Sequence, residues 1–200
     1  MAVTESTSTK LGSIAPDFNL PATDGTNYSL ESFRGAKGLV IVFTCNHCPY
    51  AKSAWPILIK LSEEFKEKGI EFVGINPNEE TQYPEDSFDV MKQRVSDWKI
   101  NFPYLRDESQ KVARAYGAVC TPDIYIYDNN RKLYYHGRIN DNWPPVEKTD
   151  GAWQARQSTL KTKEELKNAL DLLLARQPYP KKQFPSLGCS IKWKTEIEHL

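Results

Sequence analysis

Two cysteines separated by two residues are the feature of this chain with the clearest chemistry. Cys45 and Cys48 enclose Asn46 and His47, and Pro49 follows directly. Proline is favoured at the first position of a helix because its missing N–H would have had no partner there, so Cys48 is predicted to be the N-cap residue. A sulfur at that place faces unpaired backbone N–H groups and the positive end of the helix dipole, which stabilise a thiolate. The spacing therefore predicts a reactive Cys48.

Thiols in this arrangement suit either redox chemistry or metal binding. The chain has four cysteines, the other two being Cys120 and Cys189, too few to staple a secreted scaffold of this length. Soft ligands from Cys45, Cys48, Cys120 and an intervening histidine would suit copper(I) or zinc. We expect a redox site with no metal and no cofactor. A metal-binding module and a redoxin scaffold without turnover remain as alternatives.

A strand that ends at the cysteines and a helix that starts there must position them. Residues 39–44 form a continuous apolar, β-branched stretch, as expected of a strand buried on both faces of a mainly parallel sheet. Apolar residues then recur at helical spacing from residue 49 to a helix end at Lys68-Gly69. Residues 71–75 read as the next strand. This order predicts a βαβ unit with a right-handed crossover.

The rest of the chain is predicted to complete one domain. The expected ranges are 88–98, 108–116 and 162–176 for helices, and 124–127 and 133–136 for strands. In the last helix, Thr162 is the expected N-cap and Glu165 completes a capping box. The polar stretch 76–87 is expected to be an exposed loop.

The charge balance argues against several classes of partner. Lys and Arg number 26 and Asp and Glu number 26, so the formal net charge is zero. Without excess positive charge, neither nucleic acid nor a membrane surface is an expected partner. The longest apolar run is too short for a bilayer, and the first 20 residues lack the basic start and apolar core of a secretory signal. We therefore expect a cytoplasmic protein.

Several motifs along the chain carry a family resemblance. They are Ala15-Pro16-Asp17-Phe18-Asn19-Leu20, Thr23-Asp24-Gly25, Phe33-Arg34-Gly35, the cysteine junction, Val119-Cys120-Thr121-Pro122 and the ending Gly188-Cys189-Ser190-Ile191-Lys192-Trp193. Together they resemble the thioredoxin-like superfamily, specifically the AhpC/TSA redoxins of peroxiredoxin-like type. The resemblance implies an α/β, thioredoxin-like fold over residues 11–176, with a central mixed β-sheet flanked by helices and an N-terminal redoxin-type extension. A C-terminal tail, 177–200, would pack on this domain or extend from it.

The resemblance also implies an activity. The chain would be a thiol-disulfide oxidoreductase or a thiol-dependent peroxidase. Its partners would be a thiol or disulfide protein or a peroxide as substrate, and an external thiol as reductant.

The helix decides which cysteine matches the family nucleophile. Thioredoxins carry a lysine four residues and a proline eight residues after that cysteine, and counting from Cys48 gives Lys52 and Pro56. On this register Ala51 occupies the usual resolving position and Cys45 lies three residues upstream. The resemblance thus implies that Cys48 is the nucleophile and that Cys45 is its first-choice partner.

A second segment is implied to lie beside the nucleophile. In this fold the X–Pro bond that matches Thr121-Pro122 is usually cis, which makes Cys120 a rival resolving cysteine. Such a proline leaves a backbone edge free to pair with a bound peptide or thiol. Thr121, Pro122 and Pro49 are therefore the candidate substrate-binding residues.

The match to peroxidases is incomplete. Typical peroxiredoxins place a threonine three residues before the nucleophile and an arginine facing it, to polarise the peroxide. Here Cys45 occupies the first position, and Arg138 is the candidate substitute for the second. Its simpler interpretation is a solvated arginine at a strand end.

Overall fold

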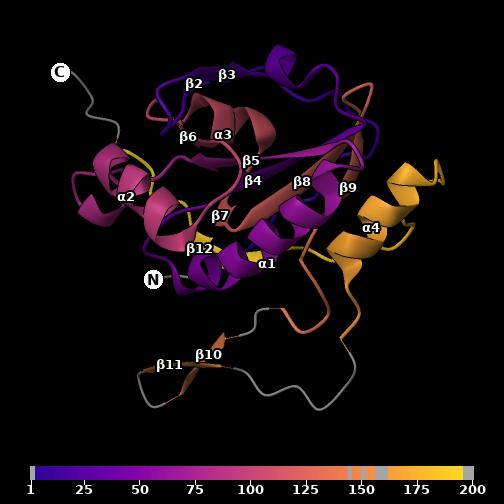
Figure 1. The fold of residues 1–200 in the computed structure, drawn as a ribbon. Coiled ribbons are helices and arrows are strands. Elements are labelled where there is room, and N and C mark those ends of the chain that lie inside the picture. Colours follow the sequence, from indigo (N-terminus) through magenta and orange to yellow (C-terminus); the bar gives the residue numbers. More distant parts are fainter. Residues whose placement is uncertain (1–2, 144–145, 150–151, 156–161, 196–200) are drawn as a thin grey trace.

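The centre of the protein is a five-stranded mixed sheet, seen in a computed structural model that describes residues 3–143, 146–149, 152–155 and 162–195. Its strand order is β6-β5-β4-β8-β9 (Figure 1). The strands are β4 (Gly38–Phe43), β5 (Ile70–Asn76), β6 (Tyr104–Arg106), β8 (Asp123–Asp128) and β9 (Leu133–His136). Strands β4, β5 and β6 run parallel, while β8 and β9 are antiparallel to their neighbours. The predicted α/β class with a mixed sheet is confirmed.

Helices cover both faces of this sheet. They are α1 (Pro49–Lys66), α2 (Phe88–Trp98), α3 (Lys111–Tyr116) and α4 (Glu165–Leu174), with 3-10 turns η1 (Leu30–Phe33) and η2 (Pro84–Asp86). Figure 1 shows α1 and α4 on one face and α3 on the other. Among the described residues, none of the helices is long and apolar enough to cross a membrane.

Strand β4 divides the core in two. Its alternate side chains point to opposite faces, as the pleat requires. Val40 and Val42 belong to the apolar cluster under α1, α2 and α4, whereas Leu39, Ile41 and Phe43 belong to the cluster under α3. All five are completely buried. The continuous apolar run therefore predicted the central strand correctly, and its rigid end is where the cysteines begin.

The predicted start of the last helix is wrong. Helix α4 begins at Glu165 with Glu164 as N-cap, so Thr162 does not cap it. The preceding residue Lys163 exchanges hydrogen bonds with Asp141, because its N–H donates to the Asp141 carboxylate and its carbonyl accepts from the Asp141 N–H. Glu165 binds Arg138 instead of closing a capping box. These tertiary contacts hold the first predicted turn out of the helix.

Helix α3 also starts later than predicted, at Lys111 instead of residue 108. Gln110 has a left-handed backbone, with φ of 61°, which ends any helix on its N-terminal side. The Asp107 carboxylate accepts the Ala113 N–H at 2.8 Å and so caps the helix from outside.

The polar stretch 76–87 is the predicted exposed loop only in its middle, because residues 81–85 are exposed or half-buried while residues 76–79 and Asp86 are buried. Asn76, Asn78 and Asp86 are at most 1% exposed. Their polar groups are buried because they bind one another: the Asn78 amide donates to the Asp86 carboxylate at 2.7 Å, and the Asn78 backbone N–H donates to Asn76 at 3.0 Å. A loop of this kind supports its neighbours as a core element does.

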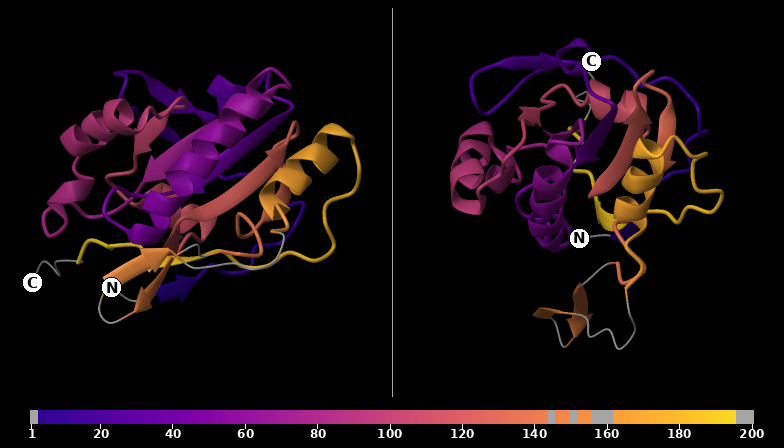
Figure 2. Two further views of the ribbon diagram at one scale, coloured as in Figure 1. Left: turned by 60° about the horizontal axis from the view of Figure 1, so that its bottom comes forward. Right: turned by 45° about the vertical axis from the view of Figure 1, so that its right-hand side comes forward.

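The two ends of the chain meet in a second, small sheet. Its order is β1-β12-β7, with β1 (Val3–Glu5), β12 (Leu187–Ser190) and β7 (Cys120–Thr121). Figure 2 shows the C-terminal strand lying against the main domain beside the N-terminal one. The remaining strands form two separate antiparallel pairs, β2 (Asn19–Pro21) with β3 (Asn27–Ser29) and β10 (Val146–Thr149) with β11 (Ala152–Ala155).

Candidate active site

Cys48 lies where the sequence places it, at the N-cap of α1 with Pro49 as the first helical residue. The Cys48 carbonyl accepts the first helical hydrogen bond from Lys52 at 2.9 Å. Cys45 follows the end of β4, and its carbonyl accepts the indole N–H of Trp55 at 3.3 Å. Both cysteine side chains are completely buried. The predicted strand–turn–helix junction is thus confirmed.

The sulfur of Cys48 is surrounded by hydrogen-bond donors. Burial acts to raise the pKa of Cys48, but hydrogen bonds from the Cys189 thiol, the Cys45 thiol and the backbone N–H groups of Ala51 and Cys189 outweigh it. Together they lower the pKa to about 3. Four donors converging on one sulfur favour the thiolate because each stabilises negative charge. Cys48 is therefore a thiolate at neutral pH, and no charged side chain is needed among its donors.

The other thiols are held in their protonated form. Burial, followed by the hydrogen bond to Cys48 and the charge of Asp86, raises the pKa of Cys45 well above its usual value. Burial and the charge of Asp123 raise the pKa of Cys120. One nucleophilic sulfur thus lies among neutral ones.

The segment 120–122 adjoins the two cysteines, as predicted. The Thr121–Pro122 peptide bond is cis. The Thr121 carbonyl oxygen lies 3.5 Å from Sγ of Cys48, and its hydroxyl is 3.2 Å from Sγ of Cys45. Sγ of Cys120, by contrast, contacts the Pro122 carbonyl at 3.7 Å. The structure therefore brings Cys45 and Cys48 against Thr121. Cys120 belongs to the same strand, β7, and its sulfur contacts the Pro122 carbonyl.

Cys189 is the residue that sequence reasoning left without a role. Strand β12 pairs antiparallel with β7, so that Cys189 lies opposite Thr121 and Ser190 lies opposite Cys120. The hydrogen bond to Cys48, followed by burial, raises the pKa of Cys189, while the charge of Lys192 lowers it. The backbone edge expected to be free for a peptide substrate is thus occupied by the protein's own chain. The one signal in the sequence was the Gly188-Cys189 motif.

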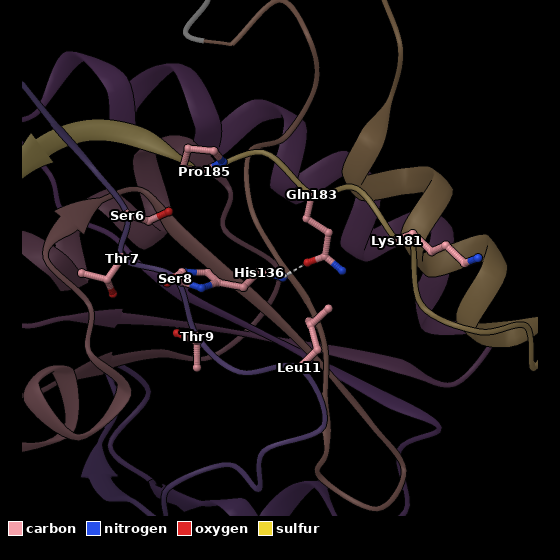
Figure 3. A pocket seen from close by; sticks show the side chains of 9 residues that line it. All are labelled: Ser6, Thr7, Ser8, Thr9, Leu11, His136, Lys181, Gln183 and Pro185. Carbon is pink, nitrogen blue, oxygen red and sulfur yellow. Dashed lines mark hydrogen bonds between the residues drawn. The ribbon is translucent and has the colours of Figure 1, made fainter.

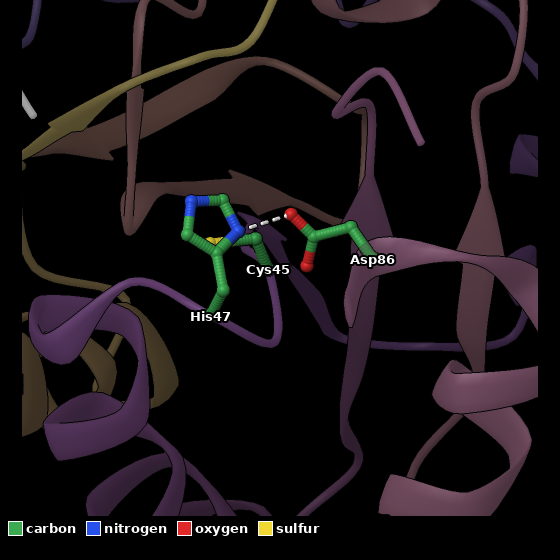
Figure 4. A group of neighbouring side chains, drawn as sticks. All are labelled: Cys45, His47 and Asp86. Carbon is green, nitrogen blue, oxygen red and sulfur yellow. Dashed lines mark hydrogen bonds and ion pairs between the residues drawn. The ribbon is translucent and has the colours of Figure 1, made fainter. Parts of the chain in front are cut away.

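Asp86 is the second residue that the sequence did not indicate. Its carboxylate accepts hydrogen bonds from the Asn46 backbone N–H at 2.6 Å and from the Asn78 amide at 2.7 Å, and it binds Nδ1 of His47 at 2.5 Å (Figure 4). The imidazole stacks on Tyr83, with ring centroids 5.2 Å apart. These contacts fix the two residues between the cysteines.

The metal-binding alternative can be compared with this geometry. Ligand atoms of Cys45, His47 and Asp86 lie within 4.8 Å of one another (Figure 4). The carboxylate is already shared among an imidazole, an amide and a backbone N–H. A cation would have to replace these hydrogen bonds, so the cluster as built orients the turn.

Arg138 and His136 each bind an acidic side chain. Arg138 forms a two-pronged ion pair with Glu165, at 2.6 and 3.0 Å, in keeping with the interpretation that it is not catalytic. Nε2 of His136 binds the Asp123 carboxylate at 2.8 Å, and its ring stacks on Tyr125.

A cavity of about 350 Å3 lies beside His136, between the N-terminal segment and the C-terminal tail (Figure 3). The residues that line it are Ser6, Thr7, Ser8, Thr9, Leu11, His136, Lys181, Gln183 and Pro185. It contains no cysteine among the described residues, so it is separate from the thiol site.

Comparisons with known proteins agree with this geometry. The profile of the AhpC/TSA family matches residues 11–136. The thiol-disulfide oxidoreductase ResA of Geobacillus thermodenitrificans is 28% identical over 130 residues, covering 65% of this chain and 70% of that protein. The crystal structure of an uncharacterized conserved protein from Geobacillus kaustophilus is 41% identical, covers 98% of both chains and has a TM-score of 0.87.

A more distant structure supports the fold alone. The thioredoxin domain of a thiol-disulfide oxidoreductase from Bacteroides vulgatus is 23% identical, with a TM-score of 0.56 over 64% of this chain and 89% of that one. The fold is therefore thioredoxin-like, as the resemblance implied.

Proposed function

The chain belongs to the AhpC/TSA family, and we propose that it is a thiol-disulfide oxidoreductase whose nucleophile is the Cys48 thiolate. The observation that carries the proposal is the place of that sulfur at the N-cap of α1, where neighbouring thiols and backbone N–H groups lower its pKa to about 3 against the effect of burial. A low-pKa thiolate with a neutral thiol beside it is the arrangement that disulfide exchange requires.

The reaction follows from the nucleophile. The Cys48 thiolate attacks one sulfur of a substrate disulfide, and the other substrate sulfur leaves as a thiolate. A second thiol of the chain then attacks the Cys48 sulfur and releases the first substrate sulfur, which leaves an internal disulfide. Cys45, the partner predicted from the sequence, is one candidate for this step because its thiol contacts Cys48. An external thiol restores the reduced protein.

A hydroperoxide is the second candidate substrate. Cys48 is completely buried beneath its neighbours, which favours an oxidant small enough to reach it without displacing β12. Attack on a peroxide oxygen would form a sulfenic acid, and a second thiol would convert it to a disulfide and water. Against this candidate stands Cys45, which occupies the position of the peroxide-polarising threonine.

The partners and compartment follow from the same chemistry. A thiol or disulfide substrate and an external thiol reductant are part of the proposal. The proposed location is the cytoplasm, a compartment that keeps thiols reduced.

The test is a parallel assay of the reduced wild type and Cys48→Ser with a small disulfide and with hydrogen peroxide, each followed by consumption of an added thiol. We expect turnover by the wild type and none by Cys48→Ser, with circular dichroism confirming that both are folded. Turnover with the disulfide alone identifies an oxidoreductase, and turnover with peroxide alone identifies a peroxidase. Full activity of Cys48→Ser would refute the proposal.

A further inference from the structure

We infer that Cys189, presented by strand β12 of the same chain, is the thiol that forms a disulfide with Cys48 during turnover. The inference deepens the proposed function and rests on it, because it needs Cys48 to be the nucleophile. It assigns a task to a segment of the C-terminal tail that sequence reasoning left without one.

The first support is the position of Cys189. Opposite Thr121 in the β12–β7 ladder, it adjoins the carbonyl that lies 3.5 Å from Sγ of Cys48. The Cys189 thiol and backbone N–H are also among the groups that lower the pKa of Cys48 against the effect of burial. A thiol held on the strand beside the nucleophile needs little movement to attack it.

The second support is that β12 is firmly anchored on both sides of Cys189. Before it, the Ser186 hydroxyl donates to the Pro122 carbonyl at 2.7 Å, and the Trp143 indole donates to the Leu187 carbonyl at 2.8 Å. After it, the Lys192 carbonyl accepts the Gln110 amide at 2.7 Å and the Glu79 N–H at 2.8 Å. These four hydrogen bonds hold Cys189 against the site, which reduces the entropy lost in reaching the reactive geometry.

The third support is Gly188. A Cβ built at this residue would lie 2.1 Å from the Thr121 carbonyl oxygen and 2.6 Å from the Thr121 carbonyl carbon. These are backbone atoms, so they have no freedom to rotate away. Only glycine lets β12 approach β7 this closely, and the residue that follows it is the cysteine.

The electrostatic setting favours Cys189 over Cys45 as the attacking thiol. After burial and the hydrogen bond to Cys48, the charge of Asp86 raises the pKa of Cys45 further. The hydrogen bond to Cys48 is the largest cause of the raised pKa of Cys189, and the charge of Lys192 opposes it. When Cys48 is oxidised its negative charge is gone, so this cause disappears while Lys192 remains. Burial still raises the pKa of both thiols at that stage, but the remaining charge lowers it for Cys189 and raises it for Cys45.

The step balances with the partners already named. In disulfide exchange, the Cys189 thiolate attacks the Cys48 sulfur of the mixed disulfide, the Cys48–Cys189 bond forms and the substrate thiolate leaves. With a hydroperoxide, the Cys189 thiol condenses with the Cys48 sulfenic acid, and the hydroxyl oxygen leaves as water. In both cases two electrons pass from the pair of thiols to the substrate, and the external thiol returns them.

The first test is a disulfide map of the oxidised full chain. Reduced wild type, Cys45→Ser, Cys120→Ser and Cys189→Ser are given one equivalent of a small disulfide or of hydrogen peroxide, alkylated and analysed by peptide mass spectrometry. We expect a Cys48–Cys189 disulfide in the first three proteins, and a trapped Cys48 mixed disulfide or sulfenic acid in Cys189→Ser. A Cys48–Cys45 or Cys48–Cys120 disulfide in the wild type overturns the inference but leaves the proposed function intact. A Cys48 that stays unmodified in every protein overturns both.

The second test uses two glycines. Gly188→Ala pushes β12 away from Thr121 without removing any thiol, so we expect the internal disulfide to form about a hundredfold more slowly, as a displacement of about 1 Å can cause. Gly35→Ala is the matched control, because a Cβ at Gly35 meets no atom within 4 Å, and it should leave the rate unchanged. Equal rates in Gly188→Ala and the wild type would contradict the inference.

Discussion

Replacing Cys189 with alanine removes one hydrogen bond from the Cys48 thiolate, and the consequence can be worked out. A hydrogen bond to a charged group contributes about 1.5–3 kcal/mol, and one pKa unit corresponds to about 1.4 kcal/mol. The structure gives Cys48 a pKa of about 3, with the Cys189 thiol as the largest of the causes that lower it. Cys189→Ala should therefore raise the pKa of Cys48 by about one to two units.

Two matched variants separate the lost donor from the lost volume. Cys189→Ser keeps an O–H donor at the same place. In this variant the pKa of Cys48 should lie between its value in the wild type and its value in Cys189→Ala. Cys120→Ala removes a thiol that contacts the Pro122 carbonyl, and it should leave the pKa of Cys48 unchanged.

The assay is a pH titration of the thiolate by its ultraviolet absorbance, with Cys48→Ser supplying the baseline. Equal midpoints for Cys189→Ala and the wild type would refute the reasoning, because the donor would then contribute nothing to the thiolate. Even after the expected rise, Cys48 remains ionised at neutral pH. A loss of turnover in Cys189→Ala would therefore reflect loss of the partner thiol and not of the nucleophile.

Three further predictions follow from other contacts. Because the folded pKa of Cys48 is about 3, the rate of its reaction with a small disulfide should be nearly independent of pH above about pH 5. The rate for a cysteine of pKa about 8.5 would instead rise about tenfold for each pH unit below that pKa, and such a rise in the measured rate would contradict the prediction. Asp86→Ala removes the carboxylate that binds the Asn46 N–H, the His47 imidazole and the Asn76 and Asn78 amides. It should lower the free energy of unfolding by about 3 kcal/mol in urea denaturation; an unchanged midpoint would count against it. Arg138→Ala breaks the ion pair with Glu165 and should cost about 1 kcal/mol of stability without slowing disulfide formation, which stopped-flow measurement can check.

The junction that carries Cys48 could be predicted because its causes are local. An apolar run of six residues specifies the strand, and Pro49 specifies the first helical residue. Cys48 directly precedes Pro49, so it is the N-cap. The helix register, with Lys52 and Pro56, then distinguished Cys48 from Cys45. Each step uses neighbours in the sequence, so none depended on knowing the tertiary structure.

Asp86 could not be predicted in this way. Its stretch is polar, and polarity alone indicates a solvent-exposed loop. What buries it is a set of partners from three parts of the chain, including the Asn46 N–H and His47 at the cysteine turn. A buried carboxylate is stable only where such donors converge, and that convergence is a property of the folded chain. The same reasoning explains the wrong start of α4, where Asp141 holds Lys163 outside the helix.

The four thiols show why composition and spacing reach only part of this site. Cys45, Cys48, Cys120 and Cys189 are all free and buried, yet only Cys48 receives donors from two other thiols and two N–H groups. The donor that lowers its pKa most comes from a strand at the far end of the chain, and that strand fits because Gly188 has no Cβ to strike Thr121. The nucleophile is thus defined by the helix it caps, while its reactivity depends on the tail that covers it. A fragment that ends before β12 would keep the first property and lose much of the second.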